Sequence, residues 1–143
     1  MIRISRDEWG LRLAEATALR ATCVRRRVGA VALDARGVVL ATGYNGAPRG
    51  RPHCLDVPCA GAGFPSGEGL DECASIHAEQ NMVARCPDAE RIHTVYVTTS
   101  PCVPCVKLLF ATGARRLVFR CLYQEEALRR WAEDGREWEM IGG

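Results

Sequence analysis

The triplet His77-Ala78-Glu79 and the later run Pro101-Cys102-Val103-Pro104-Cys105 constrain this chain more than any other feature. One imidazole and two thiolates form a ligand set that zinc accepts, and three protein ligands leave a fourth tetrahedral position for water. A carboxylate beside such an ion can carry the proton that the activated water gives up. The pattern therefore favours a catalytic zinc site, with His77, Cys102 and Cys105 as ligands and Glu79 as the proton carrier.

The spacing of these residues predicts where two helices begin. Cys102 and Cys105 are three positions apart, so in a helix opened by Pro101 both sulfurs lie on one face of the first turn, at the positive end of the helix dipole. That position favours the thiolate form, which binds zinc. His77 and Glu79 would diverge by about 200° around a long helix, so they converge only beyond the helix tip. We expect two helix N-termini to face one metal ion.

Each motif alone has a simpler interpretation. A Cys-x-x-Cys pair also occurs as a redox pair or as half of a structural zinc site, and an isolated His-x-Glu commonly lies on a helix surface. Both motifs together, in this order and with Pro101 before the first cysteine, favour catalysis. Glu79 decides between the interpretations, because a purely structural zinc site has no use for it.

Length and composition fit one domain over residues 1–143. With 143 residues, of which 48% are hydrophobic and 25% charged, the chain can bury a sizeable core but is too short for two ordinary domains. Its net charge of +2 argues against a nucleic acid partner, whereas a small phosphorylated substrate needs only a few local cations. Residues 1–10 are mixed and charged, and no apolar run approaches the about 20 residues of a membrane helix. Eight cysteines without an export signal indicate metal and thiol chemistry in a reducing cytoplasm.

Periodicity and turn residues predict alternating helices and strands. We expect helices over residues 5–22, 75–84, 102–112 and 124–134, and strands over residues 28–33, 38–44, 94–98, 117–120 and 137–141. The first two strands read as a hairpin, and β-α-β crossovers follow it. This order implies an α/β fold of three layers, α/β/α, with a mixed five-stranded sheet and helices on both faces. The segment from Gly46 to Gly69 is rich in Gly, Pro and Cys and is too long for a plain connection.

Four stretches of the chain resemble the deoxycytidylate (dCMP) deaminase family, within the cytidine deaminase-like superfamily of zinc-dependent deaminases. The resemblance runs over residues 23–123. The His-x-Glu and Pro-Cys-x-x-Cys motifs are shared across the superfamily. The other two stretches are typical of the dCMP branch rather than of deaminases that act on free nucleosides, guanine or tRNA adenosine. They are Cys-Val-Arg-Arg-Arg-Val-Gly-Ala at residues 23–30 and Gly-Tyr-Asn-Gly-Ala-Pro at residues 43–48.

The resemblance implies hydrolytic removal of the cytosine 4-amino group, which converts dCMP to dUMP and ammonia and supplies dUMP for thymidylate synthesis. Zinc-activated water attacks C4, and Glu79 passes a proton to N3 and to the departing amine. By motif position, the N–H of Ala78 binds the pyrimidine carbonyl and the carbonyl of Ser100 accepts from the amino group. Asn45 holds the sugar, and Tyr123 lines the base pocket.

Several of these assisting residues also have simpler interpretations. Asn45 precedes a glycine, and Asn-Gly is commonly just a turn. Tyr123 also fits a core position. Arg25, Arg26 and Arg27 can receive a 5′-phosphate through charge-assisted hydrogen bonds, and we assign Arg25 to the substrate site. A solvated run of charges explains the same three residues.

The remaining cysteines suggest a second zinc ion. Resembling bacterial proteins place cysteines around the long loop to hold a structural zinc, and four thiolates would close the tetrahedron. The corresponding residues here are Cys23, Cys54, Cys59 and Cys73, with His53 as an alternative ligand. Cys73 departs from the family pattern, because it precedes His77 by four residues instead of five. Free buried thiols are the alternative, and we expect Cys86 and Cys121 to be small core residues.

The resemblance also implies homo-oligomers, hexamers or dimers, and in some members activation by dCTP and inhibition by dTTP. Two other functions stay open at this point. One is deamination of a related substrate such as cytidine, a modified dCMP or tRNA adenosine. The other is a zinc-stabilised nucleotide-binding module without turnover, against which Glu79 argues.

Overall fold

The computed structural model of the chain describes residues 1–65, 67–69 and 74–142. In chain order the helices and strands are α1 (Arg6–Ala18), β1 (Gly29–Leu33), β2 (Val39–Tyr44), α2 (Ala78–Arg85), the short 3-10 helix η2 (Ala89–Arg91), β3 (Thr94–Thr99), α3 (Val103–Phe110), β4 (Arg116–Cys121), α4 (Glu125–Glu133) and β5 (Glu137–Met140). None of the helices in these ranges combines the length and the apolar composition that crossing a bilayer requires.

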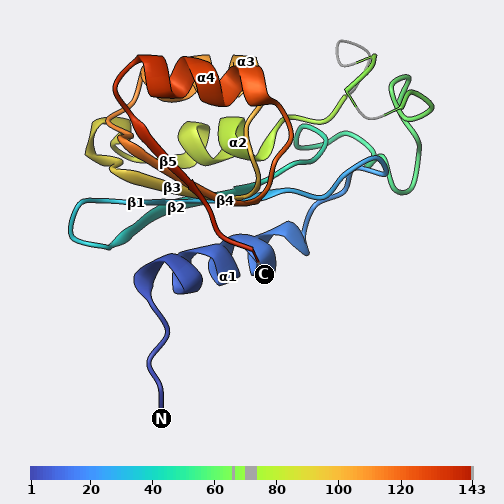
Figure 1. The fold of residues 1–143 in the computed structure, drawn as a ribbon. Helices are drawn as coiled ribbons and strands as arrows, with labels where there is room; N and C mark the ends of the chain where they lie inside the picture. The colour runs from blue at the N-terminus through green and yellow to red at the C-terminus, as the bar shows by residue number, and fades with distance from the viewer. Residues whose placement is uncertain (66, 70–73, 143) are drawn as a thin grey trace.

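The strands form one mixed sheet in the order β2-β1-β3-β4-β5. β1 runs antiparallel to both β2 and β3, whereas β3, β4 and β5 are parallel. The hairpin and the crossovers that the sequence predicts therefore both occur. The parallel strands alternate with helices α3 and α4, which carry the chain from one strand to the next (Figure 1).

Helices cover both faces of the sheet, as Figure 1 shows, which confirms the predicted three-layer α/β/α fold. On one face, Leu11 and Ala14 of α1 pack against Val31, Leu33, Tyr96 and Val118. On the other face, α2, α3 and α4 bury a larger core that includes Met82, Leu109 and Trp131. Every residue of β1 is buried, because successive side chains point to opposite faces and both faces are covered.

Two glycines allow helices to lie directly on the sheet backbone. A Cβ atom added to Gly29 would stand 2.0 Å from the carbonyl oxygen of Ala14 in α1. A Cβ atom added to Gly43 would stand 2.3 Å from the carbonyl oxygen of Ala78 and 2.4 Å from the nitrogen of Met82, both in α2. Gly43 therefore sets how closely the first turn of α2 approaches β2.

The first helix is shorter than predicted. It ends at Ala18 instead of continuing to residue 22, because Thr22 is drawn away to another segment. The N–H of Thr22 donates to the carbonyl of Asn45 at 3.1 Å, and its carbonyl accepts from Leu55 at 3.0 Å. These contacts attach the chain after α1 to the end of β2 and to the long loop.

The second helix begins later than predicted. Ile76 and Gly46 exchange two backbone hydrogen bonds, of 3.1 and 2.8 Å, so the residues before His77 are extended. α2 therefore starts at Ala78. A further prediction was wrong: Cys121 is exposed because it ends β4, beyond the buried residues Leu117, Val118 and Phe119. Cys86 is half-buried and packs against the larger core.

Charged side chains attach α1 to strands β3 and β4 in the interior of the sheet. Arg116 donates to both carboxylate oxygens of Asp7, at 2.6 and 2.8 Å, and the hydroxyl of Tyr96 donates to the same carboxylate at 2.7 Å. Arg120 pairs with Glu8 and also donates to the carbonyls of Ile141 and Gly142. The chain's C-terminal residues thereby lie beside α1 (Figure 1).

Candidate metal centre and substrate cavity

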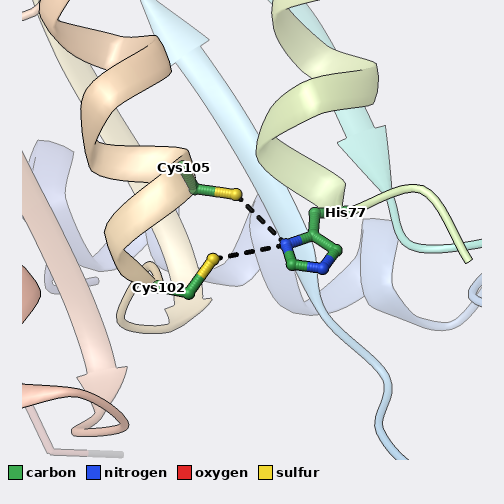
Figure 2. A group of neighbouring side chains, drawn as sticks. All are labelled: His77, Cys102 and Cys105. Atoms are coloured by element: carbon green, nitrogen blue, oxygen red, sulfur yellow. Dashed lines mark hydrogen bonds between the residues drawn. The ribbon is translucent and has the colours of Figure 1, made fainter. Parts of the chain in front are cut away.

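His77, Cys102 and Cys105 come together between α2 and α3 (Figure 2). The Nδ1 atom of His77 lies 3.2 Å from the sulfur of Cys105 and 3.4 Å from the sulfur of Cys102. Among the residues that the structure describes, these three form the one group of three ligand-type side chains whose ligand atoms all lie within 4.8 Å. The two separate sequence motifs thus meet at one point in space.

Both motifs stand at helix N-termini, as their spacing predicts. His77 is the N-cap of α2, and Cys102 is the N-cap of α3; both have extended backbone, so their side chains turn toward the space before the helices. Glutamine side chains support both turns. The N–H of His77 donates to Oε1 of Gln80 at 2.8 Å, and the N–H of Val103 donates to Oε1 of Gln124 at 3.1 Å.

The geometry of this group fits zinc. With Zn–N of about 2.0 Å and Zn–S of about 2.3 Å, a tetrahedral ion separates a nitrogen ligand from a sulfur ligand by about 3.5 Å. The two separations from His77 Nδ1, 3.2 and 3.4 Å, are close to this value. One imidazole and two thiols supply three ligands, which leaves one tetrahedral position for another molecule.

The three groups shift one another's pKa values. The hydrogen bond from Cys105, aided by one from His77, lowers the pKa of Cys102 to about 4 despite its burial. The same contact raises the pKa of Cys105, and the hydrogen bond to Cys102 raises the pKa of His77. Zinc binds cysteine as thiolate and histidine as neutral imidazole, so a metal ion bound here has to displace any proton held by Cys105 and by His77.

Glu79 lies beside this centre but is not one of its ligand-type group. Its side chain is buried, with 4% exposure, and lines the same cavity as His77 and Cys102. Burial raises the pKa of Glu79 to about 7, and the nearby Cys102 charge acts in the same direction. A carboxyl group with a pKa near neutrality can both take up and release a proton, which is the property of a general acid and base.

A cavity opens from this centre, and it contains the residues that sequence analysis assigned to the substrate. Its lining includes Arg25, Asn45, Ala78, Ser100 and Tyr123, together with Cys23, Arg26, Val28, Ser75 and Thr99. The hydroxyl of Ser100 accepts a hydrogen bond from the N–H of Tyr123 at 2.7 Å. This bond fixes the start of the segment after β4 against the cavity wall.

Asn45 bonds to the chain itself. Its Oδ1 accepts from the N–H of Val28 at 2.7 Å, and its Nδ2 donates to the carbonyl of Arg26 at 2.7 Å. The bond to Val28 is buried, and the bond to Arg26 is partly buried. Asn45 thereby shapes the cavity wall as well as lining it.

The three consecutive arginines have different surroundings. Arg25 donates to the carbonyls of Gly61, Pro65 and Glu68, so its guanidinium braces the long loop. Arg26 is half-buried, lines the cavity and stacks on the Tyr123 ring, with its guanidinium carbon 3.7 Å from the ring centroid. Arg27 is exposed. From the sequence we assign Arg25 to the substrate site. A run of three arginines does not indicate which side chain faces the loop, the cavity or the solvent.

Two of the remaining cysteines lie together in the long loop. The sulfurs of Cys54 and Cys59 are 3.7 Å apart, and the Cys59 sulfur accepts from the N–H of Ala74 at 3.5 Å. Cys23 is buried and lines the substrate cavity, and the ligand atoms of Cys23, Cys54 and Cys59 do not all lie within 4.8 Å of one another. The predicted ligand Cys73 lies outside the described residues.

Comparison with known proteins finds matches to this fold and these motifs. A family model described as "Cytidine and deoxycytidylate deaminase zinc-binding region" matches residues 4–121. The chain is 39% identical over 125 residues to a deoxycytidylate deaminase of Mycobacterium phage D29, covering 83% of this chain and 97% of the phage protein. It is 33% identical over 130 residues to that of Schizosaccharomyces pombe, covering 87% of this chain but only 40% of the yeast protein.

A solved structure shares the fold. It is the dCMP deaminase of cyanophage S-TIM5 in complex with dCMP and dUMP, which superposes with a TM-score of 0.74 at 25% identity and covers 99% of this chain and 100% of the phage chain. The family match spans both sequence motifs and most of the sheet. This chain belongs to the cytidine and deoxycytidylate deaminase family.

Proposed function

We propose that the chain hydrolyses dCMP to dUMP and ammonia and thereby supplies dUMP for thymidylate synthesis. The observation that carries the proposal is the buried Glu79 beside the cluster of His77, Cys102 and Cys105, at the end of one cavity. Relatives named deoxycytidylate deaminase in a phage and a yeast support dCMP as the substrate. The bound dCMP and dUMP of the cyanophage structure support it further.

In this reaction, three residues would bind the metal and a fourth would transfer protons. His77, Cys102 and Cys105 would hold zinc, which supplies the Lewis acidity that makes water nucleophilic near neutral pH. Glu79 would take one proton from the attacking water and deliver it to N3, and would then move the proton of the new C4 hydroxyl to the 4-amino nitrogen as the C4–N bond breaks and the C4 carbonyl forms. Ammonia leaves, so atoms and charge balance.

The cavity wall would position the pyrimidine. The N–H of Ala78 lies in the first turn of α2, where no helix partner satisfies it, and it would donate to the pyrimidine 2-carbonyl. The carbonyl of Ser100, at the end of β3, would accept from the amino group that leaves. Asn45 would contact the sugar and Tyr123 the base, since both line the cavity.

The test compares substrates with and without the phosphate. Zinc-loaded protein is assayed with dCMP, deoxycytidine and CMP by steady-state kinetics. We expect the highest kcat/KM for dCMP. Equal values for dCMP and deoxycytidine would contradict the nucleotide assignment, and an absence of turnover with all three would reduce the chain to a binding module.

A second, structural zinc is also part of the proposal. The 3.7 Å separation of the Cys54 and Cys59 sulfurs is close to the about 3.8 Å expected between two thiolates on tetrahedral zinc. Cys23, Cys73 and His53 are the candidates for the remaining ligands. Metal analysis should give two zinc ions per chain for the parent and one for Cys54→Ser with Cys59→Ser, and a value of one in both would contradict it.

The rest of the assignment follows from the family. We propose one deaminase domain over residues 1–143, acting in the cytoplasm as a homo-oligomer, a hexamer or a dimer. A chain with eight cysteines and metal-ligand motifs suits a reducing compartment. Light scattering measures the assembly, and assays with dCTP and dTTP test whether they act as effectors.

A further inference from the structure

Gln124 has a side chain that serves a helix other than its own. It is the N-cap residue of α4, where Ser, Thr, Asp and Asn are the preferred residues, and its side chain makes no capping hydrogen bond to α4. Its Oε1 instead accepts from the backbone N–H of Val103 at 3.1 Å. Val103 is the first residue of α3, so Gln124 satisfies a backbone donor that has no partner within α3.

This hydrogen bond acts on the metal centre through a peptide plane. The N–H of Val103 and the Cα atom of Cys102 belong to the same planar peptide unit, which rotates as one body. Holding that N–H therefore restricts the direction in which the side chain of Cys102 leaves the backbone. The Cys102 sulfur lies 3.4 Å from Nδ1 of His77, in the ligand-type group. Gln124 thus contacts the backbone of a metal ligand without being a ligand itself.

The residues before Cys102 are attached to the same part of the chain. The N–H of Ser100 donates to the carbonyl of Cys121 at 2.8 Å, and the Ser100 hydroxyl accepts from the N–H of Tyr123 at 2.7 Å. Cys102 therefore lies between two points of attachment, and Gln124 supplies the second of them. The cavity wall at Tyr123 is attached separately, through Ser100.

The two helices of the metal centre obtain their support in different ways. In α2, the N–H of His77 donates to the side chain of Gln80, three residues later in the same helix. The residue three positions after Cys102 is Cys105, whose sulfur belongs to the ligand-type group. A glutamine at that position of α3 would remove a metal ligand, and Gln124 provides the support from outside the helix.

We infer that Gln124 is a positioning residue for the metal centre: by holding the N–H of Val103 it orients the ligand Cys102, and this raises both zinc affinity and turnover. The effect on zinc affinity is independent of the substrate, whereas the effect on turnover rests on the proposed function. Replacing a residue that orients a metal ligand typically costs about 10- to 100-fold in metal affinity or activity.

Two variants of Gln124 distinguish this role from simple capping of α4. Gln124→Glu keeps an acceptor oxygen at the same reach, whereas Gln124→Ser is a better N-cap for α4 but is too short to reach Val103. Competition with a chromophoric chelator measures their zinc affinities. We expect Gln124→Glu to stay within about 3-fold of the parent and Gln124→Ser to lose about 10- to 100-fold. A role confined to capping α4 predicts the reverse order, and that result would overturn the inference.

Glu125→Gln is the matched control, because it changes the exposed first residue of α4 and keeps Gln124. Its zinc affinity should equal that of the parent. Substitution with Co²⁺ gives a spectroscopic readout, since the absorption bands of the bound ion depend on ligand geometry. These bands should change in Gln124→Ser and not in Gln124→Glu. An unchanged zinc affinity and an unchanged Co²⁺ spectrum in Gln124→Ser would overturn the inference.

Kinetics at saturating zinc separates this inference from the proposed function. With dCMP, kcat of Gln124→Ser should fall by about 10-fold, and KM should change by less than about 3-fold because Tyr123 keeps its bond to Ser100. A loss that appears only in KM would assign Gln124 to the cavity wall and overturn the inference. Zinc affinity that depends on Gln124 in a chain that deaminates none of the tested substrates would support the inference and contradict the proposed function.

Discussion

The side-chain oxygen of Asn45 accepts a hydrogen bond from the backbone N–H of Val28 at 2.7 Å, joining the end of β2 to the start of β1 inside the protein. In Asn45→Ala the buried N–H of Val28 and the partly buried carbonyl of Arg26 would both lose this partner. We expect a loss of about 2–4 kcal/mol in the free energy of unfolding, measured by urea denaturation. Asn45→Asp keeps the acceptor for Val28, and its free energy of unfolding should fall between those of the parent and of Asn45→Ala. An unchanged denaturation midpoint in Asn45→Ala would contradict this account.

Glu79→Gln tests the proton carrier. The glutamine has the same shape but cannot take up or release a proton near neutral pH, so kcat for dCMP should fall by about 100- to 10,000-fold. Zinc content should stay at the parent value, since the ligand-type group consists of His77, Cys102 and Cys105. Turnover equal to the parent's would exclude Glu79 from the reaction.

The pair of Asp7 and Arg116 lies on the face of the sheet opposite the metal centre. We expect this pair to make the stability of the protein depend on pH. The hydrogen bond from Arg116 holds the pKa of Asp7 below its ordinary value, with a further contribution from Tyr96. A depressed carboxyl pKa stabilises the folded state above the unfolded-state pKa of about 4, and the stabilisation is lost as the pH falls from there through the folded-state pKa. Both partners are about three-quarters shielded, with exposures of 24% and 25%.

Asp7→Asn should therefore lower the free energy of unfolding at pH 7 by about 1–2 kcal/mol. The difference from the parent should shrink as the pH falls below about 4, because the parent's own carboxylate is then protonated. Denaturation curves at pH 7, 5 and 3 measure this. A difference that stays constant over the three values would show that charge on Asp7 does not contribute.

Gly43 and Gly29 form a matched pair for testing how the sheet positions the metal centre. Alanine at Gly43 would collide with the backbone of Ala78 and Met82 and displace the first turn of α2, next to His77. Alanine at Gly29 would collide with Ala14 of α1, on the other face. Both variants should lose about 1–3 kcal/mol or more in stability, from overpacking.

Of the two variants, only Gly43→Ala should weaken zinc binding, by about 10-fold or more. It displaces the first turn of α2, and this changes the orientation of the ligand His77. Competition with a chromophoric chelator measures the zinc affinity of each folded variant. Equal zinc affinities in Gly43→Ala and Gly29→Ala would show that the position of α2 does not control the ligand geometry.

The metal centre could be predicted from short sequence motifs, because each motif contains both the ligand residues and the residues that start the helix. His77 and Cys102 are both N-caps, and both motifs place the functional side chain within a few residues of a helix start. The strands were also predictable, since the continuous apolar run of β1, buried along its whole length, and the β-rich runs of the other strands can be recognised in the sequence itself.

Features that depend on distant contacts were not predictable. α1 stops at Ala18 because Thr22 pairs with Asn45, which is 23 positions away. Helical periodicity depends on neighbouring residues only and so does not predict this contact. Arg25 and Arg26 are chemically identical neighbours, and they differ only in their contacts, which are loop carbonyls for Arg25 and the Tyr123 ring for Arg26, both remote in sequence. The same limit holds for Cys121, whose exposure depends on where β4 leaves the core.

Along the sequence, the three residues of the metal centre lie on either side of β3, the middle strand of the sheet. His77 is 25 positions from Cys102 and 28 from Cys105, and all of β3 lies in that interval. An ion held by these side chains acts as a cross-link, and closing a loop of that size lowers the entropy of the unfolded chain by an amount worth about 3.5 kcal/mol. Zinc supply would then govern how long the protein survives in a cell as well as how fast it turns over substrate.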